Sequence, residues 1–282
     1  MRRWYLMLLL PVSVMLLAPR LERVAEGPLP DALDSVANSG YIARQIAYEG
    51  RYSFLQYDLN LWAWKDYAAV LPFFNALKTT PYNKVKVVHI GDSHVQADIH
   101  TGHARNRLQE VFGDGGRGLI FPYSAARTHP GCDYYSSHGG AWTFARNVQT
   151  NPAVELGLTG VSIQTRDPRA WVKILFNSFY RPVDNRTLKI FCRQGLGSFD
   201  VEIEVNGKRL PQAVSCRDSL LSYVTVRLPE SPRSLALHVK KSGPDQHYFE
   251  LHGLSLETEA NSGLLFHSVG INGAGLGSLL RQ

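Results

Sequence analysis

One hydrophobic run that ends in a glycine turn constrains this chain more than any other feature. Residues 84–90 begin with alternating polar and apolar side chains and end as a nearly continuous β-branched run, which is typical of a strand buried on both faces in a parallel sheet. Gly91 ends the run, and polar residues lead into a predicted helix from about Val95 to Phe112. A strand that turns into a helix places the turn at the carboxyl edge of the sheet, where open α/β sheets bind ligands. Ser93 is therefore expected at a ligand-binding edge.

The predicted position of Ser93 suits nucleophilic chemistry. A helix that starts here points its free N–H groups and the positive end of its dipole at Ser93. The hydroxyl would then be the attacking group, and a backbone amide would receive the oxyanion. The alternative is that Ser93 only caps the helix, as serine commonly does.

These residues carry a family resemblance. Gly91-Asp92-Ser93-His94 after a hydrophobic strand resembles the first block of the SGNH (GDSL-type) hydrolases. The continuation through residues 95–98, 108–109 and 112–118 resembles the bacterial cell-wall branch, which includes peptidoglycan O-acetyl esterases. The resemblance implies that Ser93 is the nucleophile and that its amide is one oxyanion donor. Gly91, Asp92 and His94 would complete the active-site turn, with Asp92 holding it by hydrogen bonds. No metal or organic cofactor is implied.

A second block follows near the end of the sequence. Residues 264–269 predict a strand, 270–275 a turn and Leu276 the start of a helix. This order resembles the second SGNH block, in which a glycine amide donates to the oxyanion. Gly273 is the matching position, with Gly270 or Gly275 as the fallback, because a backbone N–H that approaches substrate closely favours glycine. The alternative is a plain strand–helix turn.

The residues between these blocks predict an antiparallel β-sandwich. From about Asn151, short alternating runs are separated by turn signals, and Asn206-Gly207 is the strongest hairpin signal among them. This spacing is typical of a sandwich. The resembled esterase branch also carries an inserted jelly-roll similar to a carbohydrate-binding module here, so sugar binding is a hypothesis. The predicted strands are 161–164, 171–176, 188–191, 199–205, 223–228, 235–239 and 248–256.

The expected fold class is α/β: an incomplete flavodoxin-like SGNH sheet, three-layered (α/β/α), interrupted by the inserted sandwich. The parts are a signal peptide or anchor (1–27), an N-terminal helical segment (28–80), the first hydrolase part (81–150), the sandwich (151–258) and the resumed hydrolase part (259–282). In the helical segment, apolar residues recur every three or four positions, and Pro72 interrupts them, which predicts two short helices or a kinked one packed under the sheet. The residues of this stripe are Trp64, Tyr67, Leu71, Phe74 and Leu77.

The N-terminus and the charge indicate an exported protein. Arg2 and Arg3 precede an apolar stretch from Trp4 to Ala18, which is typical of a signal peptide or an uncleaved membrane anchor at residues 4–18. The net charge of +6 and the pI near 9.2 suit an anionic surface such as a cell wall. The basic residues are scattered, so nucleic-acid binding is not expected. The expected location is periplasmic, envelope-attached or secreted.

Several side chains leave alternatives open. Cys192 and Cys216 form either a disulfide or two free buried thiols. His89 is expected in the core, while His100 and His103 are expected in solvent rather than on a metal. Residues 112–118 predict a helix C-cap and a tight turn rather than an anion nest.

The polar residues from 119 to 142 predict a long loop near the active edge. Four of its side chains are candidates for sugar contact: Arg127, Tyr134, Tyr135 and Trp142.

The later blocks of the resembled family do not occur in these residues. The sequence has no Asp-x-x-His and no Gly-x-Asn-Asp/Glu, and a serine without a base is a weak nucleophile. We therefore expect a truncated or split esterase, inactive as given, whose complete form removes O-acetyl groups from a cell-wall or other polysaccharide. The alternative is a non-catalytic glycan-binding or envelope scaffold protein.

Overall fold

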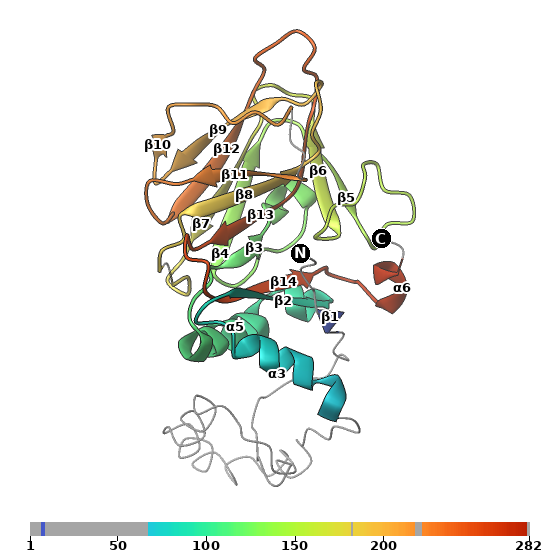
Figure 1. Cartoon of the computed structure of the whole chain (residues 1–282). Helices are drawn as coiled ribbons and strands as arrows, with labels where there is room; N and C mark the ends of the chain where they lie inside the picture. Colours follow the sequence, from blue (N-terminus) through green and yellow to red (C-terminus); the bar gives the residue numbers. More distant parts are fainter. Residues whose placement is uncertain (1–6, 9–66, 182, 218–221, 281–282) are drawn as a thin grey trace.

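The computed structural model describes residues 7–8, 67–181, 183–217 and 222–280. Figure 1 shows a small parallel sheet with helices on one side and a large antiparallel β-sandwich on the other. The predicted signal peptide or anchor lies outside the described residues except for the short strand β1 (Met7–Leu8). In the described part of the chain, no helix is long and apolar enough to cross a membrane.

The parallel sheet brings together the two predicted hydrolase strands. Strand β2 (Lys84–Gly91) pairs in parallel with β14 (Gly263–Gly270), and β1 pairs with the other edge of β2. The register places Gly91 beside Gly270, so both strands end at the same edge of the sheet. Both strand predictions are confirmed.

Two helices cover one face of this sheet. Helix α3 (Leu71–Leu77) and helix α5 (Ile99–Phe112) pack on the same side of β2 and β14 (Figure 1). The cluster that they share consists of Phe73, Phe74, Leu77, Val85, Val87, Leu108, Val111, Phe112, Leu264 and Phe266. The described residues form no second helical layer, because the sandwich lies against the other face. The three-layer arrangement is therefore not confirmed.

The predicted helical stripe forms two short helices. The 3-10 helix η2 (Tyr67–Ala69) precedes α3, and Trp64 lies outside the described residues. Pro72 lies in the first turn of α3, where backbone N–H groups have no acceptor within the helix. The missing N–H group of proline therefore costs no hydrogen bond, and Pro72 starts the helix rather than kinking it. The predicted packing under the sheet is confirmed for Phe74 and Leu77.

The single helix expected from Val95 to Phe112 is wrong. Helix α4 (Ser93–Gln96) ends after one turn, and α5 begins at Ile99. The break lies at Asp98, which has a left-handed φ of +56° that a continuous α-helix does not allow. Gly113 ends α5 with φ +83°, so the predicted C-cap and turn are confirmed there.

The long loop expected from 119 to 142 is also wrong. This segment contains strand β3 (Gly118–Ile120), the 3-10 helix η3 (Tyr123–Ala126) and strand β4 (Tyr134–Gly139). Tyr134 is buried and its hydroxyl donates to the Phe121 carbonyl, so it is a core residue rather than a sugar contact. Tyr135 is 62% exposed.

The β-sandwich contains all seven strands that were predicted for it. Its predicted start at residue 151 is wrong, because β4 and β5, which precede this residue, belong to its two sheets. In each sheet below, neighbouring strands are hydrogen-bonded. The first sheet has the order β10 (Lys208–Arg209), β9 (Asp200–Val205), β12 (Ser234–Lys240), β7 (Trp171–Phe176) and β4. The second has the order β11 (Tyr223–Arg227), β8 (Thr187–Cys192), β13 (Phe249–Glu257), β6 (Val161–Thr165) and β5 (Thr143–Arg146), and β3 also pairs with β13.

A single apolar core lies between the two sheets. Its fully buried members include Phe199, Phe249, Ile163, Ile174 and Leu237. Asn206 and Gly207 have φ of +51° and +81°, the left-handed pair that a type I′ hairpin requires, so the predicted hairpin is confirmed.

The cysteines are free thiols in this structure. Cys192 and Cys216 are buried together in the sandwich core. A hydrogen bond with Cys192, together with burial, raises the pKa of the Cys216 thiol. Of the two predicted alternatives, the structure shows buried thiols.

Candidate functional site

The turn after β2 presents Ser93 at the carboxyl edge of the parallel sheet. Asp92 caps α4, and its carboxylate accepts a hydrogen bond from the His94 amide at 3.0 Å. Ser93 is the first residue of α4 and is partly exposed. Its hydroxyl makes no hydrogen bond with the described residues. The hydroxyl is therefore free to take a ligand, and Asp92 holds the turn as expected.

Asp92 also orients the His94 ring. The ring Nδ1 lies 3.2 Å from Asp92 Oδ1, and the His94 side chain is 67% exposed. Burial would raise the pKa of Asp92, but the hydrogen bonds from the His94 amide and ring hold it below its usual range. The imidazole is thus directed at Asp92, and no contact joins it to the Ser93 hydroxyl.

The glycine turn after β14 lies beside this first turn. The Ile271 amide donates to the Gly91 carbonyl at 3.3 Å. Gly270 is packed so closely on α4 that a Cβ on it would lie 2.1 Å from the Gln96 nitrogen. Gly273 is exposed and has φ +84°, a conformation that favours glycine. The structure therefore brings the segments of Ser93 and Gly273 to one edge, and α6 (Leu276–Leu279) begins at the predicted residue.

Gln96 connects this edge to the sandwich, and sequence reasoning did not identify it. Its Oε1 accepts the Asn272 amide hydrogen from the glycine turn. Its Nε2 donates to Thr128 Oγ1 at 3.0 Å and to the His129 carbonyl. Gln96 is buried, so one side chain ties α4, the glycine turn and the segment after η3 together.

The other histidines near the sheet do not form a metal site. The rings of His89 and His100 meet edge to face with centroids 5.7 Å apart. Burial, followed by the charge of His100, lowers the pKa of His89, whereas burial, followed by the charge of His94, lowers the pKa of His100. No group of His, Cys, Asp or Glu in the described residues has an arrangement that could hold a metal ion.

A buried histidine joins the parallel sheet to β3. His267 on β14 is 8% exposed, and its Nδ1 accepts the Leu119 amide hydrogen at 3.1 Å. Burial lowers the pKa of His267 to about 4, against the opposing charge of Glu257. The neutral ring is required here, because a protonated Nδ1 could not accept the hydrogen bond.

This histidine predicts a loss of stability in mild acid. Below a pKa of about 6.5 the unfolded chain binds a proton that the folded chain does not, so the free energy of unfolding falls as the pH decreases. We expect His267 to contribute a loss of about 2 kcal/mol between pH 7 and pH 5. Urea unfolding at both values measures it. His267→Asn keeps an acceptor without the titration, and an equally large loss in this variant would contradict the assignment.

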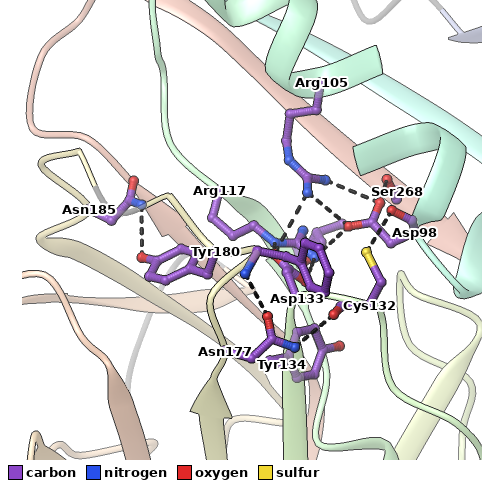
Figure 2. A network of polar contacts seen from close by, with 12 residues as sticks. Asp98, Arg105, Arg117, Cys132, Asp133, Tyr134, Asn177, Tyr180, Asn185 and Ser268 are labelled. Carbon is purple, nitrogen blue, oxygen red and sulfur yellow. Dashed lines mark hydrogen bonds and ion pairs between the residues drawn. The ribbon is translucent and has the colours of Figure 1, made fainter. Parts of the chain in front are cut away.

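Next to the site, four charged side chains form a buried cluster that the sequence did not reveal (Figure 2). Asp98 accepts from Arg105 at 2.9 Å and from Arg117 at 2.8 Å, and Arg117 also binds Asp133 at 2.6 Å. The Ser268 hydroxyl of β14 donates to Asp98 at 2.7 Å. Because Asp98 and Arg105 belong to the helical side while Arg117 and Asp133 flank β3 and β4, the cluster fastens the parallel sheet to the sandwich.

The fold and the site together define an α/β layer with a serine at a strand–helix turn, joined to an antiparallel β-sandwich. No protein-family model and no curated protein matches the sequence. The chain is similar to a solved structure described as a peptidoglycan O-acetylesterase in action, with a TM-score of 0.51 and 19% identity. The alignment covers 73% of this chain and 52% of that one, so the chain spans about half the length of that structure. At this identity the similarity concerns the fold.

Two carbohydrate-binding modules also align with the chain, at lower similarity. A family 32 module from C. perfringens in complex with galactose has a TM-score of 0.30 at 14% identity, covering 50% of this chain and 98% of the module. A pectin-binding module has a TM-score of 0.28 at 8% identity, covering 46% of this chain and 94% of the module.

Proposed function

We propose that this chain belongs to an exported serine ester hydrolase of the SGNH type that removes O-acetyl groups from peptidoglycan or another polysaccharide. The observation that carries the proposal is the register of β2 and β14, which brings the Ser93 turn and the glycine turn to one edge. The fold similarity to a peptidoglycan O-acetylesterase supports it. The pattern of the first 18 residues supports export.

In this proposal Ser93 Oγ attacks the ester carbonyl carbon and forms a tetrahedral intermediate. The amides of Ser93 and Gly273 donate hydrogen bonds to the oxyanion. Gly273 suits this role because its exposed backbone carries no side chain that would block the approach of an ester. Asp92 and Gly91 shape the turn, and Gln96 fixes the distance between the two turns through Asn272. No metal or cofactor takes part.

The proton of Ser93 needs a base. No histidine in the described residues contacts the Ser93 hydroxyl, and the proposal places the base in an Asp-x-x-His sequence like that of the resembled family. The test therefore uses two proteins, the 282-residue chain and the product of its complete reading frame.

We expect the product of the complete reading frame to hydrolyse p-nitrophenyl acetate and to lose this turnover to background when Ser93 is replaced by alanine. The hydroxyl is the only group of Ser93 that the substitution removes, so its loss abolishes covalent catalysis. Ser137→Ala, on the exposed side of β4, is the matched control and should keep full turnover. Wild-type turnover in the Ser93 variant would refute the nucleophile assignment.

The alternative is a non-catalytic glycan-binding or envelope protein, and the absence of a described histidine at Ser93 favours it. In that case neither protein hydrolyses the ester, while the chain is still retained on insoluble peptidoglycan or xylan. Sedimentation of the full chain with each polymer tests this alternative. Ester turnover that depends on Ser93 would exclude it.

A further inference from the structure

Two arginines lie against one aromatic ring at the edge of the sandwich, and we call them the arginine pair. The guanidinium carbon of Arg127 is 5.7 Å from the centroid of the Phe144 ring, and that of Arg146 is 5.5 Å from the same centroid. Arg127 follows η3, while Phe144 and Arg146 belong to the edge strand β5. Both distances are within the range of cation–π contacts.

Neither member of the pair has an acidic partner among the described residues. Arg105 and Arg117, by contrast, are each bonded to buried carboxylates. The Nε of Arg146 is also buried without a hydrogen-bond partner in the described part of the chain. Two like charges held near one ring without a carboxylate partner favour the binding of an oxyanion.

The position of the pair relates it to the candidate site. The two residues after Arg127 are Thr128 and His129, which accept the hydrogen bonds of Gln96 on α4. Val148, two residues after Arg146, would lie 3.9 Å from a Cβ placed on Gly273. Along the chain, Arg127 therefore directly precedes the segment that is bonded to Gln96, and Arg146 lies two residues before Val148, which faces the glycine turn.

We propose that the arginine pair binds a carboxylate group of an acidic polysaccharide and so selects an anionic glycan as the substrate of the proposed esterase. This inference rests on the proposed function for the identity of the site, but its binding step is independent of catalysis. The planar guanidinium fork matches a carboxylate in a bidentate manner. The ring of Phe144 lies against both forks, and their terminal N–H groups make no hydrogen bond with the described residues. A neutral glycan offers no group that would compensate the two charges.

The test measures binding of the full chain in a Ser93→Ala background, so that hydrolysis does not affect the result. The probes are polygalacturonate, which carries carboxylates, and a xylan without uronic-acid side chains as the neutral polymer. Arg127→Gln combined with Arg146→Gln removes the pair. Lys208→Gln combined with Arg233→Gln removes the same charge from exposed positions of the other sheet, on β10 and just before β12, and is the matched control. Affinity electrophoresis at low salt gives each dissociation constant, and circular dichroism checks the fold.

We expect the loss of the pair to weaken polygalacturonate binding about tenfold and the control to leave it nearly unchanged, because two charge-assisted hydrogen bonds are removed only in the first case. Equal weakening in both double variants would show a general charge effect and overturn the proposal. Wild-type affinity without the pair would overturn it as well. Stronger binding of xylan than of polygalacturonate by the chain that retains both arginines would also contradict the proposal.

These outcomes separate the inference from the proposed function. Pair-dependent binding of polygalacturonate together with no ester turnover would refute the hydrolase and leave the anion site in place. Ser93-dependent turnover together with pair-independent binding would refute the anion site and leave the hydrolase in place.

Discussion

Replacing Asp98 by asparagine is expected to lower the free energy of unfolding by about 3–5 kcal/mol. Asp98 is 2% exposed, and its carboxylate accepts hydrogen bonds from both Arg105 and Arg117. The buried cluster holds two negative and two positive groups, so the substitution leaves one positive charge without compensation. It also places an amide donor where guanidinium groups donate. Urea unfolding at pH 7 measures the change.

The charge on Asp98 is strongly held in the folded protein. Burial would raise the pKa of Asp98, but Arg117 and Arg105 outweigh it and hold the pKa well below its usual range. The carboxylate is thus ionised at neutral pH. Neutralising it by mutation therefore imposes a state that the folded chain does not otherwise adopt.

Asparagine separates this electrostatic effect from a backbone effect. Asp98 has φ +56°, and asparagine is among the residues that tolerate this region best. Asp184→Asn is the matched control, because Asp184 pairs with Arg186 on the exposed surface. We expect the control to unfold at nearly the wild-type urea concentration. If Asp98→Asn behaves like the control, the cluster contributes little to stability.

The elements that follow from local sequence were predicted well. Strands β2 and β14 and the strands from β6 onward, except the two-residue strand β10, have an alternation or a β-branched run that needs no distant partner to be recognised. The Asn206-Gly207 hairpin depends on two adjacent residues that tolerate positive φ. The starts of α4 and α6 are likewise set by turn residues next to them.

The features that were missed depend on distant contacts. Asp98 breaks the expected helix because its carboxylate binds Arg117, 19 residues away, and Ser268, 170 residues away. Without those partners, the residues around Asp98 have the pattern of one continuous helix. Likewise, β3 has only three residues and β4 is largely polar, and both are strands because β13 and β7 offer them edges to pair with.

The candidate site was predicted only in part for the same reason. Ser93, Asp92 and Gly273 stand in short motifs that sequence reading can find. Gln96 meets Thr128 and Asn272, which are 32 and 176 residues away, and no motif spacing indicates such a connection. The roles of Ser93 and Gly273 in catalysis stay predictions until turnover is measured.

Replacing Gly270 by alanine is expected to lower the free energy of unfolding by about 3 kcal/mol. The new Cβ would lie 2.1 Å from the Gln96 nitrogen and 2.6 Å from the Asp92 carbonyl oxygen. Both are backbone atoms of the α4 turn, so no side-chain rotation can relieve the overlap. Helix α4 must therefore move away from β14. This movement separates Gln96 Oε1 from the Asn272 amide, whose hydrogen bond it accepts in the unmodified protein. Urea unfolding measures the loss of stability.

Hydrogen exchange distinguishes this displacement from a general loss of stability. Relative to the unmodified protein, we expect Gly270→Ala to accelerate exchange of the Asn272 amide more than exchange of the amides in the sandwich core, because the helix that protects Asn272 has shifted. Gly277→Ala is the matched control: Gly277 lies in α6, is exposed and has no atom within 4 Å of the added methyl group. It should leave both stability and exchange unchanged. Normal protection of Asn272 in the Gly270 variant would mean that α4 tolerates the methyl group, and close contact between the two turns would then not be what fixes the position of Ser93.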